Sequence, residues 1–126
     1  MNTTNLQTKI FECAESLGAI SEMYPGVAQR FATARFTYDQ AKALAWREFL
    51  AESTKDGGKK PTEGTLESEV TIAVAAEQQE VRDATAALDS INKHFDLVKA
   101  SLSAYQSAAK FAETEVRIAG AGGYGS

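Results

Sequence analysis

The segment that decides the fold is residues 70–116, VTIAVAAEQQEVRDATAALDSINKHFDLVKASLSAYQSAAKFAETEV. Apolar residues recur in it at alternating steps of four and three, and it contains neither Gly nor Pro. A pattern of this kind over roughly seven heptads predicts one long helix with an apolar seam, packed on other helices as a left-handed coiled coil. Glu77 is the only charged member of the seam, whose positions are Val70, Val74, Glu77, Val81, Ala84, Leu88, Ile91, Phe95, Val98, Leu102, Tyr105, Ala109, Ala112 and Val116.

Two shorter helices are expected before this segment. Residues 4–22 open with a capping box, Thr4 to Gln7, and carry apolar residues at helical spacing. Residues 27–53 repeat the alternating steps of four and three in their first half. Between the two helices Pro25 and Gly26 predict a kink or a short turn. Residues 54–64, TKDGGKKPTEG, lack apolar side chains and predict a basic, solvated loop before a third helix over 65–118.

These elements predict an all-α fold with one helical domain over residues 1–119. Helix 27–53 would fold back antiparallel on the first half of helix 65–118, and the short N-terminal helix would cover the second half, which makes an elongated antiparallel helical hairpin or coiled coil. The glycines of residues 120–126 predict a flexible tail, because ordering glycine is costly in entropy.

Several apolar residues of the third helix lie off its seam. They include Leu97 and Phe111, with Ile72, Ala100, Ala104 and Ala108. A rod of two helical layers leaves such residues uncovered, so self-association is expected. Leu97 and Phe111 are the predicted oligomer interface of a homo-oligomer.

Composition bounds the partners and the compartment. With 17 acidic and 13 basic residues the formal net charge is −4, which gives no global attraction to a polyanion. Cys13 is the only cysteine, so no intrachain disulfide can form, and no stretch resembles a secretion signal or a membrane span. We therefore expect a cytoplasmic protein without a membrane partner.

Catalysis and metal binding find little support in the residues. His94 is the only histidine and is expected at the helix surface, while Cys13 lies on the apolar side of the first helix. Paired carboxylates at Glu113 and Glu115 lack the Glu-x-x-His motif of dimetal helical sites. We expect no enzyme activity, no cofactor and no metal site, and we interpret Glu77 as a polar residue that either sets the helix register or lies where the seam meets a loop.

Basic residues are the remaining candidates for a binding site. Arg35 and Lys42 stand seven residues apart on one helix, and Lys59 and Lys60 cluster in the loop. Basic rows beside aromatic side chains can hold a phosphate backbone with stacked bases. The alternative is that these residues form solvated faces neutralised by acidic neighbours. An oligomer would repeat each small patch, and avidity would strengthen weak contacts.

Two stretches carry a resemblance to a known family. Residues 41–70, AKALAWREFLAESTKDGGKKPTEGTLESEV, and residues 102–113, LSAYQSAAKFAE, resemble the small phage recombination mediators of the UvsY type. The resemblance implies a ring-forming helical protein that binds single-stranded DNA and helps to load a strand-exchange recombinase in the cytoplasm of a phage-infected bacterium. The family's basic positions would correspond to Lys42, Arg47 and Lys110, with Lys59 and Lys60 nearby.

Two functions follow as hypotheses. The first is a non-enzymatic, oligomeric single-stranded-DNA-binding accessory protein that works with a recombinase or a single-strand-binding protein. Its candidate phosphate-binding residues are Arg35, Lys42, Arg47, Lys59, Lys60 and Lys110, and its candidate stacking residues are Trp46 and Phe49. The alternative is a helical structural or adaptor protein, for example a virion or assembly component, that acts through protein contacts.

Overall fold

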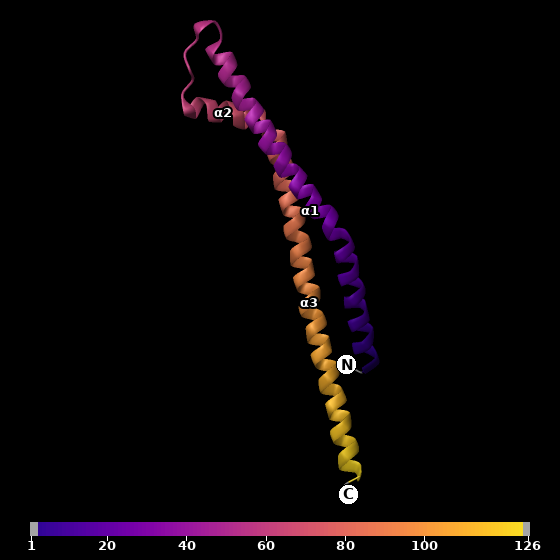
Figure 1. The fold of residues 1–126 in the computed structure, drawn as a ribbon. Helices are drawn as coiled ribbons and strands as arrows, with labels where there is room; N and C mark the ends of the chain where they lie inside the picture. Colours follow the sequence, from indigo (N-terminus) through magenta and orange to yellow (C-terminus); the bar gives the residue numbers. More distant parts are fainter. Residues whose placement is uncertain (1–2, 125–126) are drawn as a thin grey trace. The chain divides into compact units, whose positions relative to one another are not determined.

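The computed structural model describes residues 3–124, and within that range the fold is all-α (Figure 1). Its elements are α1 over Thr3–Thr54, the short 3₁₀ helix η1 over Lys55–Gly57, α2 over Glu63–Ala73 and α3 over Ala75–Tyr124, with no strand among the described residues. The predicted fold class is therefore confirmed at the level of long helices that pack on one another.

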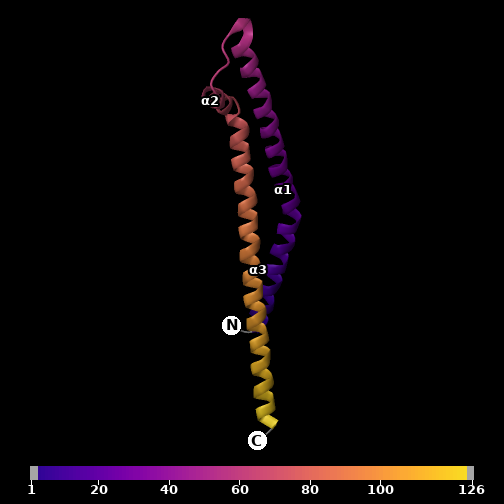
Figure 2. The ribbon, with the colours of Figure 1, turned by 60° about the vertical axis from the view of Figure 1, so that its left-hand side comes forward.

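The chain divides into two compact units. Unit 1 comprises Met1–Tyr24 and Ser90–Ser126, and unit 2 comprises Pro25–Asp89. In each unit a segment of α1 lies beside a segment of α3 that runs in the opposite direction (Figures 1 and 2).

The predicted seam runs along α2 and α3 and is their covered side. In unit 2 Val70, Val74 and Ala84 are buried, and in unit 1 Ile91 is buried while the later seam positions up to Ala112 are half-buried except Phe95. Val116 departs from the pattern, since 69% of its surface is exposed. The reason lies within unit 1, where the last turns of α3 extend past the beginning of α1 (Figure 1).

Pro25 does not end a helix. A separate short N-terminal helix is expected from the sequence, whereas α1 is one helix of 52 residues with Pro25 inside it. A proline in a helix interior removes one backbone hydrogen bond and costs about 3 kcal/mol. Covered residues on both sides, among them Ile20 and Phe31, offset that cost by tertiary packing, which routinely overrides local propensity.

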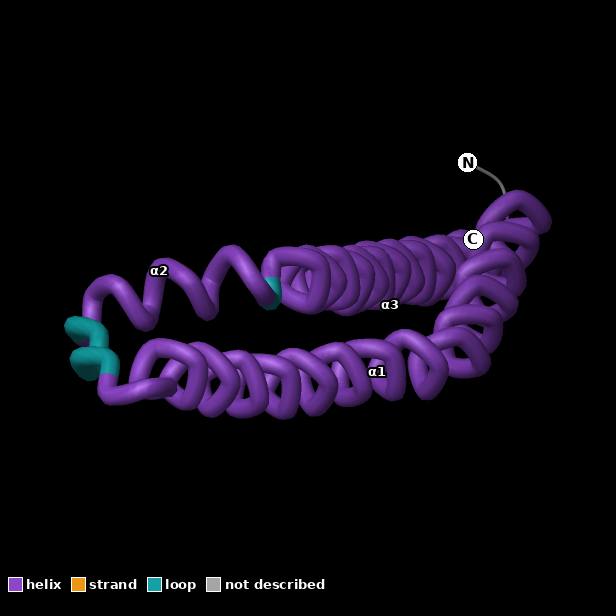
Figure 3. Tube along the Cα trace, turned by 90° about the horizontal axis from the view of Figure 1, so that it is seen from above, coloured by secondary structure: helices purple, strands orange, loops and turns teal. Residues whose placement is uncertain are grey.

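The third predicted helix is divided at Val74. This residue has φ −105° and ψ 18°, and α2 ends at Ala73 while α3 begins at Ala75 (Figure 3). The hydrogen bonds nevertheless continue across it, because the Val74 amide donates to the Val70 carbonyl at 3.0 Å and the Gln78 amide donates to the Val74 carbonyl at 2.9 Å. The change of direction keeps Val70 and Val74 together in a buried cluster with Ala45 of α1.

The loop between α1 and α2 is built by its glycines. Asp56 and Gly57 have positive φ, at 57° and 80°, which turns the chain sharply in the second half of η1. A Cβ on Gly58 would collide with the Ser53 carbonyl oxygen, so only glycine fits there. The chain then enters α2 at Thr62, whose hydroxyl accepts a hydrogen bond from the Thr65 amide at 3.2 Å as an N-cap.

The end of the chain also differs from expectation. The flexible tail was predicted over residues 120–126, but α3 continues to Tyr124, and residues 125 and 126 lie outside the described range. Extending an existing helix fixes one residue for each hydrogen bond gained, so helical geometry can continue from α3 into glycine-rich sequence.

Candidate nucleic-acid interface

Three candidate phosphate-binding residues lie on α1 in unit 2. Arg35, Lys42 and Arg47 are all exposed. Arg35 and Lys42 are seven residues apart, which is close to two helical turns, so they share one face of α1. Arg47 follows Lys42 by five residues and therefore points about 140° away from it. The helix brings Arg35 and Lys42 together and sets Arg47 apart.

Lys42 has an aromatic neighbour. Its Nζ lies 5.9 Å from the centroid of the Tyr38 ring, within the range of a cation–π contact. Tyr38 itself packs against the buried cluster of Ala45, Val70 and Val74. The fold therefore holds the Tyr38 ring in place, and the exposed Lys42 side chain sets its ammonium group beside that ring.

The loop presents two further cations. Lys59 and Lys60 follow Gly58 and are both exposed. The backbone around them is held by the hydrogen bond from the Gly58 amide to the Lys55 carbonyl, at 3.2 Å. An anchored loop end with free lysine side chains suits contacts to a flexible polyanion.

The two stacking candidates are less accessible to a nucleic-acid base than aromatic side chains on an open surface. Trp46 and Phe49 are half-buried and pack against the buried cluster of unit 2. Phe49 also lines a hollow with Glu48 and Glu52, whose carboxylates disfavour a nearby phosphate. Phe36, by contrast, is 61% exposed on α1. The heptad pattern could have predicted that Phe36 is exposed, because this residue falls between the seam positions.

Intrachain ion pairs involve other cations. In the described part of the chain they join Lys9 to Glu12 at 3.5 Å, Arg30 to Glu80 at 2.7 Å and Arg117 to Glu113 at 2.8 Å. None of the six candidate phosphate-binding residues belongs to these pairs. Lys110 is exposed on α3 in unit 1, and the nearby carboxylate of Glu113 forms its ion pair with Arg117 instead. Neutralisation by a neighbouring carboxylate is thus not seen at the candidate positions.

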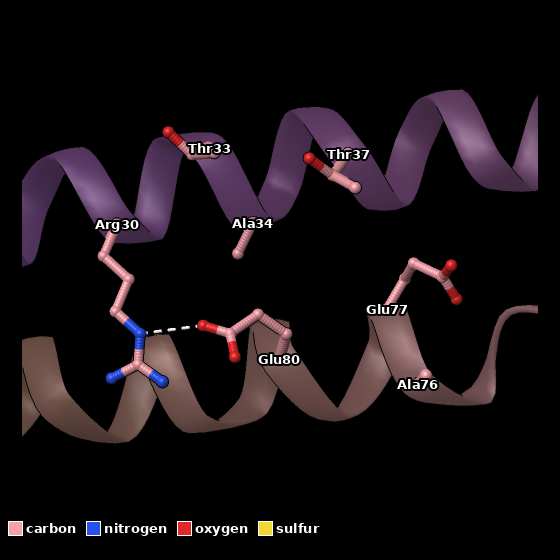
Figure 4. Close-up of a pocket in the computed structure, with 7 residues that line it drawn as sticks. All are labelled: Arg30, Thr33, Ala34, Thr37, Ala76, Glu77 and Glu80. Atoms are coloured by element: carbon pink, nitrogen blue, oxygen red, sulfur yellow. Dashed lines mark hydrogen bonds and ion pairs between the residues drawn. The ribbon is translucent and has the colours of Figure 1, made fainter.

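Polar side chains of α1 and α3 face one another in unit 2. A hollow of about 410 Å³ is lined by Arg30, Thr33, Ala34, Thr37, Ala76, Glu77 and Glu80 (Figure 4). The Arg30 guanidinium donates to Glu80, and this hydrogen bond, with the charge of Glu80, raises the pKa of Arg30. Glu77 is half-buried on the seam, and its Oε2 is buried without a hydrogen-bond partner among the described residues. Glu77 therefore interrupts the apolar packing of the seam with an unsatisfied polar atom.

Residues considered for other chemistry lie in unit 1. His94 is exposed as predicted, and Cys13 is half-buried. Both line a shallow hollow that includes Lys9, Glu12 and Tyr105. In the described part of the chain no three His, Cys, Asp or Glu side chains are grouped as metal ligands.

Comparisons with known proteins leave the family open. No protein-family model, curated protein or solved structure matches the chain. Within residues 3–124 no helix has the length and apolar character needed to cross a membrane.

The interface candidates remain uncovered in unit 1. Leu97 and Phe111 of α3 are 68% and 66% exposed. The alanines of the same set, at positions 100, 104 and 108, are exposed as well. These side chains are therefore accessible on α3, and Leu97 also lines the hollow that Lys9 and Cys13 of α1 line.

Proposed function

We propose that this chain is a non-enzymatic, homo-oligomeric single-stranded-DNA-binding protein that assists a recombinase. In this proposal the helices form an antiparallel hairpin, and several hairpins associate. The observation that supports it is the state of the six candidate cations: each is exposed, and none forms an ion pair within the described chain. A cation that already has a carboxylate partner must give it up before it binds phosphate, whereas a free one releases counterions from DNA directly.

Charge explains why the proposal requires an oligomer. A net charge of −4 repels a polyanion at long range, and one chain carries few cations on any one face. Repetition of the Arg35–Lys42 face and of the loop lysines in several copies gives many weak phosphate contacts on one strand. Their combined affinity exceeds that of any single contact by a large factor.

The test is a salt series with a fluorescent oligo(dT) probe. For single strands the logarithm of affinity falls with the logarithm of salt concentration by about 0.7 per phosphate contact. Exchange of both Lys59→Glu and Lys60→Glu should weaken binding and lower this slope by about 1.4 for each subunit that contacts the strand. A matched control, Lys9→Glu with Lys99→Glu, changes the net charge equally but leaves the candidate residues intact.

The outcomes separate specific contacts from overall charge. Binding that the loop variant loses and the control retains supports the proposal. Equal loss in both variants, or no binding by the unmodified chain at low salt, contradicts it.

Trp46 offers a second readout because it is the only tryptophan in the chain. A base that stacks on its indole would quench its fluorescence and shift it on DNA binding. DNA binding without a change in this emission would remove Trp46 from the site, which would then consist of the cations alone.

The second candidate function is a structural or adaptor protein, and the exposed apolar face of α3 favours it. Leu97 and Phe111 are large side chains in solvent, as expected of a protein-docking surface. Apolar docking responds weakly to salt, whereas phosphate binding responds steeply. A partner retained at high salt, together with no DNA binding at low salt, would establish this alternative.

A further inference from the structure

The exposed face of α3 in unit 1 has a symmetry of its own. Seven residues follow one another along it, and they read Lys93, Leu97, Ala100, Ala104, Ala108, Phe111 and Glu115. All seven are exposed. Their steps of four, three, four, four, three and four are the same from either end. They average about 3.67 residues per turn, near the 3.6 of a straight helix, so they stay on one side over a length of about 33 Å.

The side-chain types on this face are arranged as symmetrically as their positions. A large apolar side chain stands on each side of the alanines, Leu97 before them and Phe111 after them. A charge stands at each end, positive at Lys93 and negative at Glu115. Neither Lys93 nor Glu115 forms an ion pair or a side-chain hydrogen bond with another described residue.

We propose that this face binds the same face of a second copy of the chain, antiparallel, about a two-fold axis at Ala104. A two-fold contact is self-complementary, so each residue meets the one at the mirrored position. Leu97 then packs on Phe111 of the second copy, Ala104 meets Ala104, and Lys93 pairs with Glu115 at both ends. The alanines in the centre allow the two helix axes to approach closely.

Charge selects the direction of this dimer. In a parallel arrangement Lys93 would face Lys93 and Glu115 would face Glu115, and like charges at such positions are destabilising. The antiparallel arrangement converts both contacts into ion pairs. It also leaves the seam of α3 to α1, since the two faces occupy different sides of the helix.

This inference deepens the oligomer part of the proposed function and rests on that part only. DNA binding takes no part in its test, so a dimer that fails to bind DNA would refute the proposed function and leave the interface standing. A DNA-binding chain without this contact would do the reverse.

The test is disulfide cross-linking of the full chain in a Cys13→Ala background, with the mass measured by light scattering. Ala104→Cys should link to itself under mild oxidation, because only the residue on the axis meets its own copy. Ala100→Cys alone should not link, but it should link when mixed with Ala108→Cys. Circular dichroism of each variant checks that the helices are retained, and the three alanines replaced by cysteine are all exposed.

A charge exchange gives an independent measurement. Lys93→Glu should raise the dissociation constant of the dimer about tenfold, since it replaces two attractions by two repulsions. The further change Glu115→Lys should restore it, and Lys99→Glu, off this face, should leave it unchanged. A monomer at tens of micromolar, self-linking of Ala100→Cys as efficient as that of Ala104→Cys, or no rescue by the second charge change would overturn the inference.

Discussion

Glu77 places an uncompensated carboxylate oxygen in the apolar seam of unit 2, and replacing it should stabilise the protein. Its Oε2 is buried and has no hydrogen-bond partner among the described residues. An unsatisfied buried polar group costs about 1–3 kcal/mol. Glu77→Leu removes that cost and adds apolar surface at a half-buried position, worth roughly 1 kcal/mol more.

The magnitude is discounted because part of Glu77 remains in solvent. We expect the free energy of unfolding to rise by about 2 kcal/mol, which for a chain of this length raises the Tm on the order of 8 °C. The measurement is thermal and urea unfolding followed by circular dichroism, at one fixed protein concentration because association also contributes to stability.

The control is Glu67→Leu, which removes the same charge from an exposed position on α2 in the same unit. Its effect should stay within about 0.5 kcal/mol, as for most surface substitutions. A Glu77→Leu variant that is no more stable than the unmodified chain, or a Glu67→Leu variant that gains as much, would show that the buried Glu77 oxygen does not destabilise the fold.

Three further substitutions test local features. Pro25→Ala supplies the missing amide to the carbonyl of Ser21 in α1 and should raise stability by about 3 kcal/mol, seen as a higher urea midpoint; an unchanged midpoint would mean that the helix does not pass through residue 25. Thr62→Ala removes the N-cap of α2 and should cost about 1 kcal/mol in the same assay, whereas Thr62→Ser should cost little. Asp56→Gly relieves a left-handed backbone, φ 57°, and should gain up to about 1 kcal/mol; a loss would show that the Asp56 side chain stabilises the turn.

The seam was predictable because its signal extends over many turns. A heptad repeat accumulates with length, so that a single polar member such as Glu77 does not hide it. The loop could also be predicted, since apolar side chains are absent over residues 54–64 while glycine and lysine are frequent there. Each of these signals is carried by the composition of the segment itself.

The continuous helix at Pro25 and the helix break at Val74 could not be predicted from the sequence, for opposite reasons. At Pro25 a strong local signal for a break is overridden by packing on both sides of it. At Val74 a break occurs where the local signal is silent, because the dihedral angles there follow from the burial of Val70 and Val74 against Ala45. Both are effects of tertiary structure on one residue.

The candidate site likewise has one part that the sequence predicts and another that depends on tertiary packing. A spacing of seven residues was sufficient to place Arg35 and Lys42 on one face. The accessibility of Trp46 and Phe49 depends instead on which side of α1 the helices cover beyond the regular seam, and that information lies in the cluster around Val70.

The division into units implies an order of folding. The two segments of unit 2 are joined directly by the loop after Thr54, so their contacts close a short stretch of chain. Unit 1 unites the two ends of the chain, and its contacts close a loop that contains the whole of unit 2. Since the entropy of closure grows with loop length, pairing should begin beside the loop and proceed toward the termini. Amide hydrogen exchange should then be slowest around Val70 and fastest in the terminal turns of α1 and α3.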